Sequence, residues 1–144
     1  MVRSSGSSAG ASMERAVQFF AATSFLVIGL SHLLRPGAWI EFFAKLRELG
    51  RPGAFAEGFI GLNFGAIIVS FHNVWSGPAV VLTLIGWSQV LKAFFRFVAP
   101  EASLRVYEKI RPERAWQIRV AGVLAVALSA FLAFLAFREP MTGR

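Results

Sequence analysis

Four long apolar segments dominate the sequence, and their length limits the folds open to the chain. Each is close to the roughly 20 residues that an α-helix needs to cross the hydrocarbon core of a bilayer. The chain has 144 residues, of which 56% are hydrophobic and 16% are charged, whereas soluble domains average about 25% charged. A soluble domain of this size could not bury so much apolar surface. We therefore predict an all-α integral membrane four-helix bundle, with spans over about 16–34, 55–75, 78–98 and 115–137.

Two shorter amphipathic segments separate the spans on one side of the membrane. In the first, aromatic residues recur at helical spacing from Trp39 to Phe43, with charged residues between them. In the second, Leu104, Tyr107 and Ile110 have the spacing of one helix face. Both segments are too short to cross a bilayer. We predict that they are helices lying in the membrane interface, over about 38–49 and 101–111.

The ends of the chain differ from its middle. Residues 1–12 are small and polar, a composition typical of disorder, and residues 139–144 form a short polar tail. The sequence thus predicts a disordered tail over 1–12, one membrane domain over 13–138 and a second tail. Met13 is an alternative start to Met1, and one sequence does not decide between them.

The two halves of the chain resemble each other when one is shifted by 64 positions. Pro36 then meets Pro100, Phe43 meets Tyr107, and Gly58 meets Gly122. Each half would hold a span, an interfacial helix and a return span. Since both halves would enter the membrane from the same side, we predict two parallel repeats related by an axis along the membrane normal.

Basic residues are concentrated on one side of the predicted spans. The formal net charge is +7, and most Lys and Arg residues fall in or beside the two amphipathic segments. The positive-inside rule predicts that both segments face the cytoplasm and both termini lie outside, in a cytoplasmic (inner) membrane. Nucleic-acid binding would also need positive charge, but no nucleic-acid motif accompanies it. Anionic lipid headgroups are the partner that this charge favours.

Few residues offer catalytic chemistry. The chain has no Cys, which excludes disulfides and thiolate metal sites. His32 and His72 fall near opposite ends of their spans, so they could not reach one metal ion. No carboxylate lies deep in a span, as a proton-coupled exporter would require. We therefore expect no catalytic residues, no metal site and no cofactor.

A polar layer near the cytoplasmic ends of the spans is the remaining candidate site. Its residues are Glu57, Gln89, Lys92, Arg96 and Arg119. Charges within spans are expensive and often functional, which suggests a pocket for an anion or a lipid headgroup. In the alternative interpretation, the bases simply extend to lipid phosphates while Glu57 pairs with one Arg.

Three short motifs carry a family resemblance. Gly-Leu-Ser-His-Leu-Leu-Arg-Pro, His-Asn-Val-Trp and Gly-Trp-x-x-x-x-Lys are similar to segments of small uncharacterised four-span bacterial integral membrane proteins. The resemblance covers nearly all of 18–137 and implies no activity and no functional residues.

Two functions are consistent with these features. The first is a non-enzymatic structural or accessory subunit that packs with other membrane helices or with itself. The second is a binder or carrier of a small amphipathic or anionic molecule, such as a lipid or a quinone. The second function requires a cavity that reaches Lys92 or Arg96, and the first does not.

Overall fold

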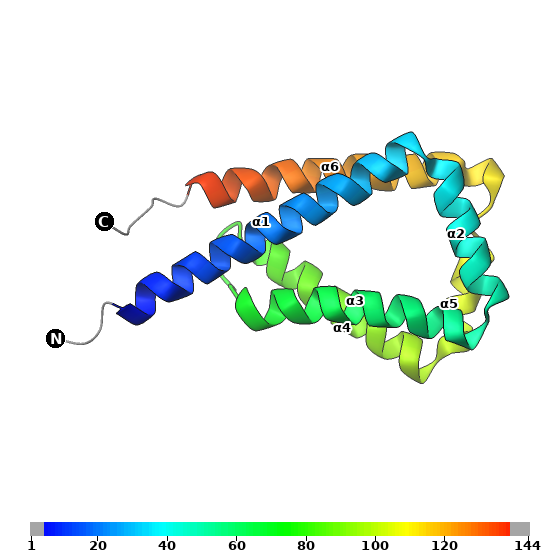
Figure 1. Cartoon of the computed structure of the whole chain (residues 1–144), viewed down its shortest axis with the longest axis horizontal. Coiled ribbons are helices and arrows are strands. Elements are labelled where there is room, and N and C mark those ends of the chain that lie inside the picture. Colours follow the sequence, from blue (N-terminus) through cyan, green and yellow to red (C-terminus); the bar gives the residue numbers. More distant parts are fainter. Residues whose placement is uncertain (1–4, 139–144) are drawn as a thin grey trace.

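The computed structural model describes residues 5–138, and the predicted tail at 139–144 lies outside them. Four helices in the described range are long and apolar enough to cross a membrane, which confirms the all-α class and the four spans. No strand is found within residues 5–138. The elements are α1 (Ser5–Leu34), α2 (Pro36–Glu48), α3 (Arg51–Phe71), α4 (Val80–Val98), α5 (Pro100–Tyr107), the 3-10 turn η1 (Pro112–Arg114) and α6 (Ala115–Arg138) (Figure 1).

Helix α1 begins at Ser5 and runs for 30 residues, so the predicted disorder over 1–12 is wrong from Ser5 onward. Residues 1–4 lie outside the described range. Nucleating a helix is costly, whereas extending one adds a hydrogen bond for each residue fixed. The apolar span supplies the nucleus, and the small residues before Met13 continue it. Composition alone therefore overestimated disorder here.

Proline marks the start of each of the two short helices. Pro36 and Pro100 occupy the first turn of α2 and α5, where the missing N–H of proline costs nothing. Helix α5 ends at Tyr107, four residues earlier than predicted. Arg111 precedes Pro112 and has an extended backbone with φ −131° and ψ 157°, because the proline ring disfavours a helical residue before it.

The second span also ends earlier than predicted, at Phe71 instead of residue 75. His72 leaves the helix, and its Nε2 donates a hydrogen bond to the Ala79 carbonyl, with a 3.1 Å separation. The Thr83 hydroxyl accepts a bond from the Val74 N–H at 3.0 Å and donates to the Val74 carbonyl at 2.8 Å. The Thr83 side chain from α4 thus satisfies backbone groups that a longer α3 would have satisfied itself.

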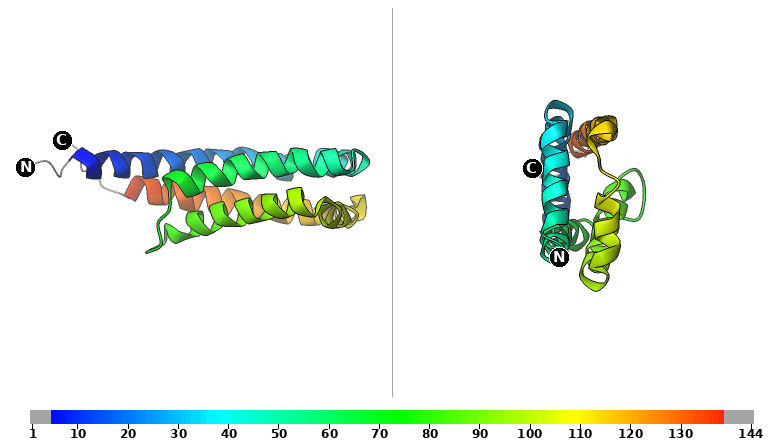
Figure 2. Two further views of the ribbon diagram at one scale, coloured as in Figure 1. Left: turned by 90° about the horizontal axis from the view of Figure 1, so that it is seen from below. Right: turned by 90° about the vertical axis from the view of Figure 1, so that its right-hand side faces the viewer.

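The helices form two layers, each made from one half of the chain. Figure 2 shows α1, α2 and α3 in one layer and α4, α5 and α6 in the other. Across the layers, α1 packs on α6 and α3 packs on α4. The two pairs lie apart at one end, where α2 and α5 connect them (Figure 1). The order of span, short helix and span is therefore repeated, with both halves running in the same direction.

The apolar core lies at the end of the molecule away from α2 and α5. All four spans contribute to it, and the ring of Phe25 on α1 meets that of Phe64 on α3 edge to face, with centroids 5.6 Å apart. Core packing thus joins the two helix pairs at this end. The buried members of this cluster are Val17, Ala21, Ala22, Ile68, Leu82 and Leu132.

Glycines set the close contacts between the layers. A Cβ on Gly122 would lie 2.9 Å from the Gly29 carbonyl oxygen, and a Cβ on Gly65 would lie 2.8 Å from that of Gly86. Gly122 therefore packs in the same way as Gly65. The 64-residue shift had instead paired Gly122 with Gly58. The helix crossing in the α3–α4 pair lies about two turns further from the interfacial helices than the crossing in the α1–α6 pair.

Candidate functional site: a basic pocket where α4 meets α5

Gly58 brings α4 close to α3 near the start of α3. A Cβ at this position would lie 3.3 Å from both the Arg96 Cβ and the Phe97 ring. The glycine therefore permits an approach that places Arg96 beside Glu57, the residue preceding Gly58. The close packing of α4 on α3 and the contact between Arg96 and Glu57 thus depend on the same segment of α3.

Arg96 and Glu57 form a two-pronged ion pair between α4 and α3. The Nε and Nη2 groups of Arg96 donate to the two carboxylate oxygens of Glu57. Both side chains are largely buried, with exposed fractions of 18% and 23%. Paired geometry of this kind is the strong form of a carboxylate–guanidinium contact. The interpretation that Glu57 pairs with one Arg is confirmed.

A pocket of about 260 Å³ opens beside this ion pair, on the inner side of the bend between α4 and α5. Two basic residues, two hydroxyl-bearing residues and two apolar residues line it, and most of its surface is apolar. We call it the basic elbow pocket. Its lining residues are Lys92, Phe95, Arg96, Ser103, Val106 and Tyr107.

Tyr107 is the most buried member of the basic elbow pocket. Only 4% of its surface is exposed, and its ring lies against Phe43 of α2, with centroids 5.7 Å apart. Its hydroxyl is buried and has no hydrogen-bond partner among the described residues. A buried hydroxyl without a partner costs roughly 1–3 kcal/mol, so a ligand oxygen that reached the Tyr107 hydroxyl would remove this cost.

The structure divides the polar layer that the sequence predicted. Glu57, Lys92 and Arg96 belong to one site, with Lys92 exposed at the pocket. Gln89 is half-buried at the α3–α4 contact, where its Cβ lies 3.0 Å from a Cβ built on Gly65. Arg119 is exposed on α6, a helix that packs on α1 and α2, and it does not line the pocket.

Sequence reasoning missed Ser103 and Tyr107 as site residues. The spacing of Leu104, Tyr107 and Ile110 was read as an apolar face pointing into the membrane interface. Tyr107 is the only tyrosine in the chain, and a hydroxyl on a buried face was the signal that could have identified it.

A second pocket, of about 250 Å³, lies at the corresponding bend between α1 and α2. We call it the neutral elbow pocket. A shift of 64 positions converts Ser31, Trp39 and Phe42 into Phe95, Ser103 and Val106, so the two elbows are equivalent positions of the repeat. The same shift converts Lys92 and Arg96 into uncharged Ile28 and the imidazole of His32. The neutral elbow pocket is lined by Ser31, Ala38, Trp39 and Phe42.

Polar groups at the neutral elbow pocket already have partners within the protein. The Trp39 Nε1 donates to the Ser31 hydroxyl at 2.8 Å. The His32 ring stacks on Trp39 with centroids 4.0 Å apart, and its Nδ1 donates to the Ile28 carbonyl at 2.7 Å. The elbow of the second half of the chain is thus charged. The equivalent elbow of the first half is neutral, and the polar groups named here bond within the protein.

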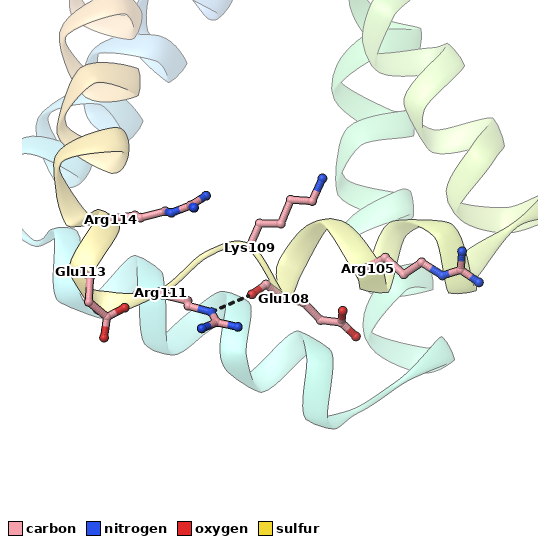
Figure 3. A pocket seen from close by; sticks show the side chains of 6 residues that line it. All are labelled: Arg105, Glu108, Lys109, Arg111, Glu113 and Arg114. Atoms are coloured by element: carbon pink, nitrogen blue, oxygen red, sulfur yellow. Dashed lines mark hydrogen bonds between the residues drawn. The ribbon is translucent and has the colours of Figure 1, made fainter.

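A third hollow, of about 770 Å³, lies beyond α5 at the polar end of the molecule. Figure 3 shows Lys109 and Arg114 extending to one side of the chain, while Glu113 and Arg111 extend to the other. The Arg111 Nε donates to the Glu108 carbonyl at 3.4 Å. Because four bases and two acids provide its whole lining, it is a charged surface at this end of the molecule. The lining residues are Arg105, Glu108, Lys109, Arg111, Glu113 and Arg114.

Comparison of the chain with protein-family models, curated proteins and solved structures gives no match. The geometry of the site is therefore the basis for a functional proposal.

Proposed function

We propose that this chain is a non-enzymatic multi-pass membrane protein that binds the phosphate group of an anionic phospholipid in the basic elbow pocket. The observation that carries the proposal is a cavity that is lined by both Lys92 and Arg96 and by Tyr107, whose hydroxyl is buried and has no partner among the described residues. This cavity is the feature that separates a binder of an anionic amphipath from an accessory subunit.

The chemistry of the pocket favours a phosphate. Lys92 supplies a positive charge, and the Ser103 and Tyr107 hydroxyl groups supply donors. A guanidinium carries five N–H donors, so Arg96 retains three after binding Glu57. Phe95 and Val106 are both exposed at the pocket. A ligand with an anionic head and an apolar tail matches this combination, whereas a fully hydrated ion would leave the apolar part of the lining unused.

The position of the pocket also favours a lipid. It lies where a membrane-spanning helix turns into an amphipathic helix, and this is the level of the headgroups. By the positive-inside rule, we place this end of the molecule in the cytoplasmic leaflet of the inner membrane. Lys and Arg side chains near such a helix end carry their charge toward the interface.

The test measures lipid binding by the purified full chain with native mass spectrometry. The probes are phosphatidylglycerol and phosphatidylcholine, added separately to the protein in detergent. We expect tighter binding of phosphatidylglycerol. Lys92→Gln and Tyr107→Phe should each weaken it about tenfold, equivalent to about 1.4 kcal/mol, because each removes one contact to the phosphate. Tyr107→Phe keeps the aromatic ring that packs on Phe43.

Two controls make this result specific. Arg119→Gln removes the same charge as Lys92→Gln but lies outside the pocket, so binding of phosphatidylglycerol should not change. Inorganic phosphate at millimolar concentration should not displace the lipid. Displacement by phosphate would identify a phosphate-ion site instead of a lipid site. Unchanged lipid binding in both pocket variants would contradict the proposal.

A further inference from the structure

We infer that the basic elbow pocket selects a singly charged phosphodiester headgroup over a doubly charged phosphomonoester, and that Glu57 determines this selectivity. The inference rests on the proposed function and goes further, because it names the charge class of the ligand and assigns a role to a residue outside the pocket lining.

The ion pair determines the charge that a ligand encounters. Arg96 is held by Glu57 through two hydrogen bonds, one to each carboxylate oxygen, so the charge of Arg96 is balanced inside the protein. Lys92 has no ion pair with any described acid. The lining and its bound carboxylate therefore present one uncompensated positive charge.

One net positive charge matches a monoanion. A phosphodiester carries one negative charge and would neutralise Lys92, while its oxygens accept bonds from Tyr107 and from the remaining N–H groups of Arg96. A phosphomonoester carries up to two negative charges near neutral pH. Its second charge would have no partner in the lining. The Glu57 carboxylate would repel it through a partly buried region that screens charge poorly.

The shape of the ion pair supports a positioning role for Glu57. Since a two-pronged contact fixes the plane of the guanidinium, Glu57 also determines which N–H groups of Arg96 face the pocket. Gly58, directly after Glu57, makes this geometry possible by admitting α4. Glu57 thus acts on the ligand through Arg96 and does not contact it.

The test compares two lipids of nearly the same size. Phosphatidic acid is a phosphomonoester, and phosphatidylmethanol is its methyl ester with one negative charge. Both are offered at pH 8, where the monoester carries two charges, to the full chain in vesicles of phosphatidylcholine. We expect the wild-type protein to bind phosphatidylmethanol about five times more tightly than phosphatidic acid.

Two variants that each raise the net charge of the site by one unit should shift this preference. Glu57→Gln removes the internal carboxylate, and Ser103→Lys adds a base to the pocket while leaving the ion pair intact. In each variant we expect the ratio of the two affinities to move at least fivefold toward phosphatidic acid. If the Glu57 variant does not fold, the Ser103 variant still tests the inference. Glu48→Gln, which removes an exposed carboxylate of α2 outside the pocket lining, should leave the ratio unchanged.

The outcomes separate the inference from the proposed function. A wild-type protein that binds neither anionic lipid better than phosphatidylcholine would overturn both. A protein that binds both lipids equally, or prefers phosphatidic acid, would overturn the charge selectivity and leave the lipid site standing. Variants that keep the wild-type ratio would also overturn the inference.

Discussion

At the scale of single residues, two glycines of one motif have different roles. Gly61 and Gly65 are four positions apart on α3, the spacing that lets two membrane helices approach closely. A Cβ on Gly65 would lie 2.8 Å from the Gly86 carbonyl oxygen and 2.9 Å from the Val90 nitrogen. A Cβ on Gly61 would meet only the Gln89 carbonyl oxygen, at 4.0 Å. Of these two glycines, only Gly65 sets the distance between α3 and α4.

We predict that Gly65→Ala destabilises the protein by about 1–3 kcal/mol, the usual cost of adding a methyl group to a closely packed contact. The neighbouring atoms belong to the backbone, so they cannot move aside cheaply. Gly61→Ala is the matched control and should be neutral or slightly stabilising, because alanine favours a helix more than glycine does. The free energy of unfolding in mixed micelles measures both variants, and equal effects would contradict the predicted contact.

At the scale of the elements, one ion pair joins the start of α3 to α5. The Arg51 Nε donates to a Glu101 carboxylate oxygen at 2.8 Å. The pKa of Glu101 lies below its ordinary value of 4.5, first because its carboxylate accepts a hydrogen bond from its own backbone N–H, and also because Arg51 is close. Since a lowered pKa means that folding favours the ionised form, this contribution is present above the ordinary pKa. It is lost as pH falls through the lowered one.

We therefore predict a pH-dependent difference between the wild-type protein and Glu101→Gln. At pH 7.5, amide hydrogen exchange across 100–107 should be faster in the variant, because α5 loses its attachment to α3 and a favourable charge in its first turn. The difference should disappear as pH falls through the lowered pKa of Glu101, where the wild-type carboxylate also becomes neutral. Glu48→Gln, which breaks an exposed pair within α2, should leave α5 unchanged. Equal exchange at pH 7.5 would contradict the prediction.

At the scale of the whole molecule, the charges of the loops lie at one end. The loop between α3 and α4 has no charged residue in 72–79. The opposite end holds α2, α5 and η1, with basic side chains on each of them. The positive-inside rule takes the side with the excess of Lys and Arg to be the cytoplasmic one. The fold brings to one end of the molecule the basic residues that the sequence places in two separate segments.

We predict that the loop between α3 and α4 faces the outside of the cell. Because the chain has no Cys, single cysteines at Ser76 and Glu113 can report the two sides without interference. Both positions are exposed, and neither has a positive φ. A membrane-impermeant thiol reagent should label the Ser76→Cys variant in intact cells, and the Glu113→Cys variant only after the cells are permeabilised. The opposite pattern would reverse the orientation.

The sequence by itself determined the number of spans and the two short helices between them. These features are local: a bilayer requires about 20 apolar residues for each span, and Pro36 and Pro100 begin helices wherever they pack. The same reasoning went wrong where a neighbouring element decided the outcome. Helix α3 ends at Phe71 because Thr83, on another helix, satisfies the loop backbone.

Only the tertiary structure decided which residues form the site. The spans are apolar on most of their faces, so their sequences do not specify which pairs pack together. Packing brings Glu57 to Arg96 across 39 positions, buries Tyr107 against α2 and leaves Arg119 on a separate helix pair. Sequence spacing placed Lys92 and Arg96 on one face of α4, since neighbours four apart share a face. Sequence reasoning did not identify Tyr107. This residue comes from α5, which reaches Lys92 and Arg96 only because the chain turns sharply at Pro100.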